Sequence, residues 1–469
     1  MGRKKRELYP DFGAELRAIE ERGINAELVG KIIRKHRLNS RYNKRLYDRY
    51  RLLEDSVPIC KREPRFEEEN AVNNKIVHDF FGEIVRTKSG YLAGKPVTYA
   101  YSTTEEATES TGGADAVKKA SKVLTDFITR NNMFGVDFSL VKHMAICGYV
   151  GRLFYIDKKG QERVQMIPSY ECAILSKFSI CEPTYAVRYF YETDIDGNKT
   201  LVAEFYDEQY IQKFRGSSES DLKPVGNPEP HMFDACPLQG IPNNSEMMGD
   251  AECVMTMIDE YDRAVSDNAN EHESFAHAYM VFENLNITEE DLKTCKRSGA
   301  FRFKTSSQNG GKVYFLTKQI NDTFSENHLN RIVSDIYRFS STPNLSDDSF
   351  SNNSSGVSLK FKLHGLETKC AQAQIEMMDA AQHMWQLLCS SWAVKGIKAD
   401  PLQIVMDFKR NFPLDLESES RVAQALLAAG MPKKVVFSLM SFIDDVDYVL
   451  AELQKEQDDI PDLEDDTEE

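Results

Sequence analysis

Apolar residues recur every three or four positions over long parts of the chain, which is the spacing of one face of an α-helix. Stretches of this kind cover residues 11–53, 76–89, 117–147, 249–275, 321–340, 356–395, 416–429 and 433–457. Shorter runs with alternating character and turn residues between them predict strands at 152–156, 163–167, 185–191, 201–206, 209–215 and 403–408. The pattern therefore predicts an α+β fold that is mainly helical.

Two of the predicted helices flank a small insertion. The helix over 249–275 and the helix over 321–340 each carry one apolar stripe, and residues 276–320 between them read as short strands (278–284, 300–305, 312–316), a helix (288–296) and a tight turn. The stripes include Val254, Met257, Ile258 and Tyr261 on the first helix and Ile332, Val333 and Ile336 on the second. The turn contains Asn309, Gly310 and Gly311. This order predicts a helix pair with a small α/β unit at its end.

A strongly polar segment, STPNLSDDSFSNNSSG, follows the second of these helices. Its composition cannot support a packed core, and its Gly and Ser residues favour mobility. Its central residues are Asn344, Ser346, Asp347, Asp348, Ser349, Phe350, Ser351, Asn352, Asn353, Ser354 and Ser355. We read this segment as an exposed loop.

The helix predicted after this loop has apolar residues in alternating steps of four and three, which is the spacing of a coiled-coil seam. The seam consists of Leu359, Leu363, Leu366, Cys370, Ala373, Met377, Ala380 and Met384. From residue 356 to 395 such a helix would be about 60 Å long. We expect a rigid rod that packs along one stripe.

Composition gives predictions for four further segments. Residues 102–114 and 237–248 are predicted to be loops, because both are rich in polar or turn-forming residues. Residues 31–51 contain nine Lys or Arg opposed only by Asp48. That face is either the solvated side of an amphipathic helix or a surface for nucleic acid or an acidic neighbour. The acidic end, residues 458–469, is predicted to be disordered.

Length and charge narrow the class of protein. A chain of 469 residues is expected to form several structural units. No run of about 18 apolar residues and no signal peptide are present, so we expect a protein without contact to a membrane that stays in a cytoplasm. The nine cysteines are scattered and odd in number, which favours reduced thiols over disulfides or zinc. The net charge of −16 argues against a surface that grips nucleic acid throughout.

The sequence contains none of the common catalytic patterns. It has no phosphate-binding loop, and His272-Glu273 lacks the second histidine of a zinc-protease motif. Residues 194–198 resemble part of a calcium loop but lack its final glutamate, so we interpret them as a hairpin turn. We therefore expect no enzyme, no cofactor and no metal site.

Four long stretches, in order, resemble the portal proteins of siphovirus-type tailed phages. They are NNKIVHDFFGEIVRTKSGYLAGKPVTY, IPNNSEMMGDAECVMTMIDEYDRAVSDNANEHESFAHAYMVF, RIVSDIYRFSSTPNLSDDSFSNNSSGVSLKFKLHGLETK and the pair of C-terminal helices. The linker ACPLQGIPNNSE is short for that family. The resemblance implies a wing (1–245), a first stem helix (246–275), a clip (276–320), a second stem helix (321–343), a tunnel loop (344–356), a long wing helix with a strand (357–413), a helical crown (414–457) and an acidic tail (458–469).

In that family such chains assemble in the host cytoplasm into a ring, usually of twelve subunits, at one capsid vertex of the virion. The resemblance implies a homo-oligomer that contacts the terminase large subunit, the major capsid and scaffolding proteins and a head-completion adaptor. Double-stranded DNA passes through the channel during packaging and ejection. The stripe residues would then pack the stem, the residues from Asn344 to Ser355 would line the channel, and the turn at Asn309 would dock the terminase and adaptor. The alternatives are another virion or head–tail connector protein and, last, a DNA-processing enzyme.

Overall fold

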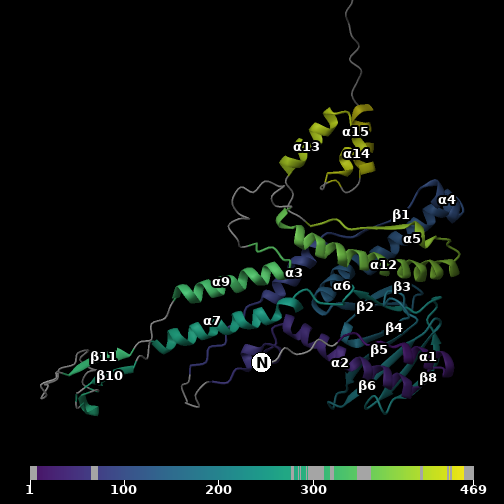
Figure 1. Cartoon of the computed structure of the whole chain (residues 1–469). Coiled ribbons are helices and arrows are strands. Elements are labelled where there is room, and N and C mark those ends of the chain that lie inside the picture. Colours follow the sequence, from purple (N-terminus) through teal and green to yellow (C-terminus); the bar gives the residue numbers. More distant parts are fainter. Residues whose placement is uncertain are drawn as a thin grey trace, which may run out of the picture.

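The computed structural model describes residues 8–64, 72–275, 279–283, 285, 287–291, 293, 311–316, 322–345, 361–411, 416–440, 443 and 446–458. These residues form a body of helices and antiparallel sheets from which one pair of helices, α7 and α9, projects (Figure 1). A small group of helices, α13 to α15, lies on another side of the body. The α+β prediction is confirmed for the described part of the chain.

The first 147 residues are mostly helical. The N-cap residue Asn25 starts the long helix α2, because its Oδ1 atom accepts a hydrogen bond from the Leu28 amide at 2.9 Å. The helix predicted from Ile76 starts only at Phe80, and it runs through Gly90. The helices are α1 Gly13–Arg22, α2 Ala26–Tyr50, η1 Glu54–Ser56, η2 Pro58–Lys61, α3 Phe80–Ala93, α4 Glu105–Thr111, α5 Ala114–Asn131 and α6 Met133–Cys147.

The loop predicted over residues 102–114 is wrong, because α4 forms there. Its last residue, Thr111, is buried, and the Thr111 hydroxyl lies 2.7 Å from the hydroxyl of Tyr101 on the preceding strand. This contact links the end of α4 to β1, and the polar composition of residues 102–114 gave no sign of it.

Two antiparallel sheets form the centre of the body. One has the order β3-β2-β9 and the other β4-β5-β6-β7-β8. All five strands predicted in this region are confirmed, but β4, β8 and β9 were missed. The strands are β2 Tyr149–Ile156, β3 Glu162–Ile167, β4 Cys172–Leu175, β5 Tyr185–Thr193, β6 Lys199–Tyr206, β7 Tyr210–Gly216, β8 Lys223–Pro230 and β9 Leu238–Pro242; η3 Ser169–Glu171 precedes β4.

The strand β9 corrects the loop predicted over residues 237–248. Leu238 pairs with Leu153 and Pro242 with Tyr149, so β9 completes the sheet on the second edge of β2. The turn predicted at residues 194–198 is confirmed, since the Asp194 Oδ1 atom accepts from the amides of Asp196 and Asn198 at 3.0 and 2.7 Å.

The projecting pair, which we call the arm, consists of α7 Met255–Phe275, β10 Tyr279–Glu283, β11 Lys312–Leu316 and α9 Asp322–Phe339. A short helix, η4 Glu252–Val254, precedes α7, so the predicted α-helix begins later than residue 249. The strands β10 and β11 pair antiparallel at the far end of the arm (Figure 1). The strand predicted over 300–305 lies outside the described residues, and so do residues 292 and 294–296 of the helix predicted over 288–296.

The long helix α12 His364–Val394 lies against the body, and its predicted seam is confirmed. Six seam residues from Leu366 to Met384 are at most 2% exposed. They pack in one core with residues from α5, α6, β2 and β9, so the partner of the seam is the body of the same chain. The strand β12 Ile404–Asp407 follows η5 Pro401–Gln403 and pairs with β1 Thr98–Tyr101. Leu359 lies outside the described residues.

The C-terminal helices are α13 Leu416–Ala428, α14 Lys433–Ser438 and α15 Val446–Asp458. The prediction of one helix over 433–457 is wrong, because it divides into α14 and α15. Asp458 belongs to α15, and the rest of the acidic end lies outside the described residues.

Candidate functional site

The arm is joined to the body by an apolar cluster at its base. Val254, Ile258, Ile332 and Ile336 are buried there, packed with Phe81, Ile84 and Val85 of α3. Met257 and Tyr261 pack against the same cluster, and Val333 is half-buried. The predicted stem-packing residues thus meet one another and α3 within a single chain.

A segment without regular secondary structure precedes α3, runs along α7 and is hydrogen-bonded to it at every second residue. The amides of Asn74, Ile76 and His78 donate to side-chain oxygens of Asn270, Ser266 and Asp262, at 2.6, 2.9 and 2.9 Å. The His78 Nδ1 atom also lies 2.9 Å from Asp262. We call residues 74–78 the strap. It ties the first helix of the arm to the start of α3.

Arg49 connects the same helix to α2. Its Nη2 atom lies 2.7 Å from Asp259 Oδ1 and 3.7 Å from Asp262 Oδ2, and its side chain is 3% exposed. Desolvation raises the pKa of both aspartates, although the Arg49 charge opposes this rise. The cations of α2 that pair with carboxylates of the same chain are Lys31, Lys35, Arg37, Lys44 and Arg49. This pairing supports the reading of α2 as part of its own domain.

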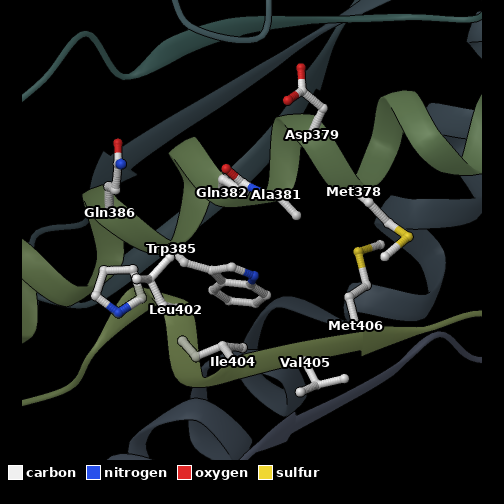
Figure 2. A pocket seen from close by; sticks show the side chains of 11 residues that line it. Met378, Asp379, Ala381, Gln382, Trp385, Gln386, Leu402, Ile404, Val405 and Met406 are labelled. Carbon is white, nitrogen blue, oxygen red and sulfur yellow. The ribbon is translucent and has the colours of Figure 1, made fainter. Parts of the chain in front are cut away.

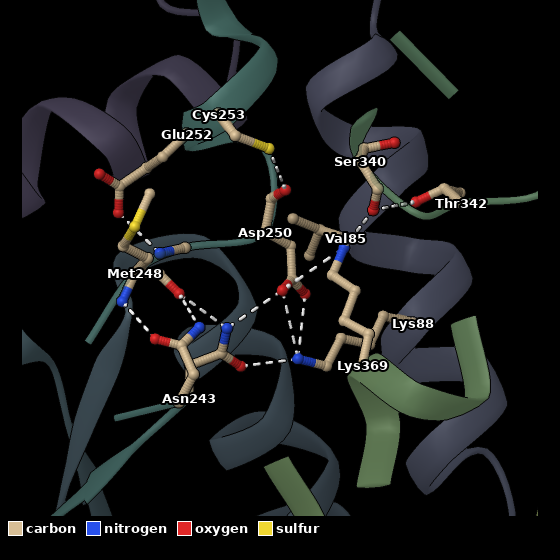
Figure 3. Close-up of polar contacts among 12 residues, drawn as sticks. Val85, Lys88, Asn243, Met248, Asp250, Glu252, Cys253, Ser340, Thr342 and Lys369 are labelled. Carbon is tan, nitrogen blue, oxygen red and sulfur yellow. Dashed lines mark hydrogen bonds and ion pairs between the residues drawn. The ribbon is translucent and has the colours of Figure 1, made fainter. Parts of the chain in front are cut away.

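A buried polar group, which we call the junction, links α3, the segment before the arm and the residue that follows α9 to α12 (Figure 3). Lys88 of α3 donates to Asn243 Oδ1 at 2.8 Å and to Asp250 Oδ1 at 3.2 Å. Asn243 in turn donates to Asp250 and to the Met248 carbonyl. Lys369 of α12 lies 3.5 Å from Asp250 Oδ1 and donates to the Ser340 carbonyl at 2.9 Å. Burial lowers the pKa of Lys88, and the nearby Asp250 charge opposes that change.

Sequence reasoning missed the junction. Lys88 follows Phe81, Ile84 and Val85 at helical spacing, so it is a cation on an otherwise apolar face of α3. That signal was available, but its partner Asp250 lies 162 positions further along the chain. Only the folded chain brings the two together.

A second buried polar group lies in the central core. Tyr99 donates to Asp137 Oδ2 at 2.6 Å, and the guanidinium of the fully buried Arg152 donates to the Ala380 carbonyl at 2.8 Å. Burial raises the pKa of Asp137 to about 7, while the Tyr99 hydrogen bond and the Arg152 charge oppose the rise. His36 is also buried, between the hydroxyls of Tyr149 and Tyr189, and burial lowers its pKa to about 3.

A cleft of about 390 Å³ lies between α12 and the segment from Pro401 to Met406 (Figure 2). Its lining is mostly apolar, with the Trp385 indole at its centre, and Asp379 is the carboxylate among the lining residues. Within the described part of the chain, no three His, Cys, Asp or Glu side chains gather where they could hold a metal ion. Of the helices described, none has the length and apolar character needed to cross a bilayer.

The structure describes only part of the predicted loop and turn. Asn344 is half-buried just beyond α9, whereas residues 346–355 lie outside the described residues. Asn309 and Gly310 also lie outside them. Gly311 precedes β11, and a Cβ atom there would clash with the side chain of Leu285.

The amino-acid sequence of this chain matches a known family over most of its length. A family model described as "Phage portal protein, SPP1 Gp6-like" matches residues 30–462. This chain belongs to the phage portal protein family. The portal protein of Bacillus phage SPP1 is 22% identical over 414 residues, covering 83% of this chain and 77% of the relative. The portal protein of Clostridium phage phiCD119 is 22% identical over 399 residues, covering 80% of this chain and 83% of the relative.

Membership of the portal family has direct consequences. The chain is a structural component of the phage virion. Portal proteins form the DNA channel that is used in packaging, and this is the role of the chain. The match spans the arm, α12, the helices α13 to α15 and all of the body except α1 and the start of α2.

Proposed function

We propose that this chain forms a closed ring, usually of twelve subunits, at one capsid vertex, and that the terminase motor drives double-stranded DNA through its centre. The observation that carries this proposal is the arm. Its two helices lie side by side, a pair of strands lies at their far end, and the long helix α12 follows the second helix in the sequence (Figure 1). In this assignment α7 and α9 are the stem, residues 276–320 the clip and residues 344–356 the tunnel loop. Residues 1–245 and α12 form the wing, and α13 to α15 form the crown.

The charge of the chain suits a channel that DNA passes without sticking. Each chain carries a net charge of −16, so a ring of twelve would carry about −190. Negative walls repel phosphates, whereas tight binding requires many Lys and Arg contacts. Electron microscopy of the purified protein should show rings with a central hole wide enough for a DNA duplex. A protein that stays monomeric under packaging conditions would contradict the proposal.

The tunnel loop is proposed to project into the channel and to follow the DNA backbone. Its Asp347 and Asp348 would keep contacts with phosphates weak, and its amide and hydroxyl groups would make transient hydrogen bonds to them. Deleting residues 347–353 should leave rings intact but reduce DNA packaging or retention. A matched deletion in the exposed turn at residues 194–198 should leave packaging unchanged.

Charge reversal in the same loop gives a second measurement. Replacing Asp347 and Asp348 by Lys should slow translocation more at low salt than at high salt, because salt screens the added phosphate contacts. Packaging at the wild-type rate by the deletion variant would refute the role of the loop.

The clip is proposed to dock the terminase and, after packaging, the head-completion adaptor. It forms the far end of the arm, with β10 and β11 as its described strands. Substitutions at Asn309 and Gly310 should weaken capture of purified terminase while rings persist. Unchanged capture by several such variants would argue against this docking site.

A further inference from the structure

We infer that Lys369 is a positioning residue for DNA passage, because it sets the joint between the second arm helix α9 and the long helix α12. The inference rests on the proposed function, in which the chain between these helices reaches the DNA. The Lys369 ammonium donates to the Ser340 carbonyl at 2.9 Å and lies 3.5 Å from Asp250 Oδ1. Its side chain is 14% exposed, so water screens these contacts only weakly.

The Ser340 carbonyl accepts from Lys369 and, at 3.3 Å, from the Thr342 hydroxyl, and it lies where α9 ends in a Schellman motif. The Thr342 amide donates to the Tyr337 carbonyl at 3.1 Å, and the Ser341 amide to the Arg338 carbonyl at 3.3 Å. Ser341 adopts the left-handed conformation that this motif requires, with φ at 53°. The helix therefore stops with the Ser340 carbonyl turned to the Lys369 ammonium.

The charges in the junction show that Lys369 is not needed to neutralise Asp250. Lys88 and Asp250 are 1% and 2% exposed and already form an ion pair at 3.2 Å. Asn243 donates to the same carboxylate at 3.1 Å. Lys369 brings a second ammonium to one carboxylate, and its shortest contact is with the end of α9. Its removal leaves the buried pair of Lys88 and Asp250 intact, whereas removal of Lys88 would take the donor from both Asn243 Oδ1 and Asp250.

The start of α12 is held independently on its other side. Arg410 binds Glu367 in bidentate fashion, with contacts of 2.7 and 3.0 Å. This pair fixes α12 to the end of β12, and Lys369, two positions later, fixes the end of α9 to α12. The end of α9 and the start of α12 are therefore held next to each other, and we call this contact the joint. The side chain of Lys369 links the two helices there.

The experiment compares Lys369→Met with Lys395→Met in the full chain. Lys395 lies just past the other end of α12, where it pairs with Glu162, so its loss perturbs the same helix far from the joint. Hydrogen exchange of residues 339–345 should become about tenfold faster in Lys369→Met and stay unchanged in Lys395→Met. Both variants should form rings and melt within about 2 °C of the wild type. Lys369→Arg, which keeps a donor at this position, should restore wild-type exchange.

The functional readout is DNA retention in particles complemented with each variant. Lys369→Met should retain at least about fivefold fewer full-length genomes than Lys395→Met. Unchanged hydrogen exchange in Lys369→Met would show that Lys369 does not hold the end of α9 to α12. Faster exchange together with normal DNA retention would show that this contact has no role in DNA passage. If the loop deletion above packaged DNA normally, the proposed function would fail, while the exchange result would still decide whether Lys369 holds the joint.

Discussion

The amide of Ile76 donates a 2.9 Å hydrogen bond to the hydroxyl of Ser266, one of three hydrogen bonds that backbone amides of the strap donate to side chains of α7. The donors are two residues apart on the strap and the acceptors four residues apart on the helix. Two residues of extended chain span about 6.6 Å and four residues of α-helix about 6 Å, so the two repeats match. Every second amide of the strap thereby finds an acceptor on one face of α7.

Ser266→Ala should destabilise the protein by about 1–3 kcal/mol, because Ser266 is fully buried and its loss leaves the Ile76 amide without its acceptor. Urea unfolding at constant protein concentration measures the change. Thr256→Ala, on an exposed position of the same helix, should change the free energy of unfolding by less than about 0.5 kcal/mol. Equal effects of the two substitutions would show that the strap contributes nothing.

Ile336→Asp should disrupt folding of the single chain at the base of the arm. Ile336 is 0% exposed and packs in the apolar cluster with Phe81 and Val85, so a carboxylate there would cost several kcal/mol. Ile336→Val should cost only about 1 kcal/mol. Circular dichroism and gel filtration should show a less stable or aggregated Asp variant. Normal rings with a normal melting temperature would show that this stripe is placed wrongly.

Ser341→Gly should stabilise the protein by about 0.5–1 kcal/mol. Ser341 has a φ of 53°, a conformation that glycine adopts without the Cβ penalty. Ser334→Gly is the matched control, because the same substitution at an exposed position inside α9 should cost about 1 kcal/mol. Thermal melting of both variants checks the opposite signs, and a loss of stability in both would contradict the strain at Ser341.

The buried carboxyl of Asp137 should make stability fall as pH rises toward 7. Burial raises the pKa of Asp137 to about 7, against about 3.9 in an unfolded chain. Between about pH 3.9 and about pH 7 the folded chain therefore binds one proton more than the unfolded chain. The free energy of unfolding falls in this range by up to about 1.4 kcal/mol per pH unit, and the fall ends once the pH exceeds the pKa of Asp137 in the folded chain. The wild type should lose stability relative to Asp137→Asn between pH 6 and 7, and no further above about 8.

Unfolding from pH 6 to 8.5 measures this difference and stays above the isoelectric point of about 5.2. Asp126→Asn, at an exposed position of α5, should show no such relative change. A constant difference between the wild type and Asp137→Asn across this range would show that Asp137 does not titrate there.

Local pattern was enough to predict most helices and strands. The steps of three and four that mark the seam of α12 and the stripes of α7 and α9 survive in the structure, because burying an apolar stripe requires that spacing whatever covers it. The hairpin strands β5, β6 and β7 pair with their sequence neighbours, so their register depends on short turns. The resemblance to portal proteins rested on these same long patterns.

Partners distant in the sequence decided the rest. The strand β9 depends on its pairing with β2, and α4 depends on Thr111 packing beside Tyr101, which composition could not reveal. The stripes were visible in the sequence, but only the tertiary structure showed that they pack within one chain. Lys88 and Asp137 are buried titratable side chains, and each is held by a hydrogen bond to a residue of another element, Asn243 and Tyr99 respectively. The sequence by itself determined which surfaces must be covered, because periodicity is local; tertiary structure alone decided what covers them, because burial of a polar group depends on partners that folding brings together.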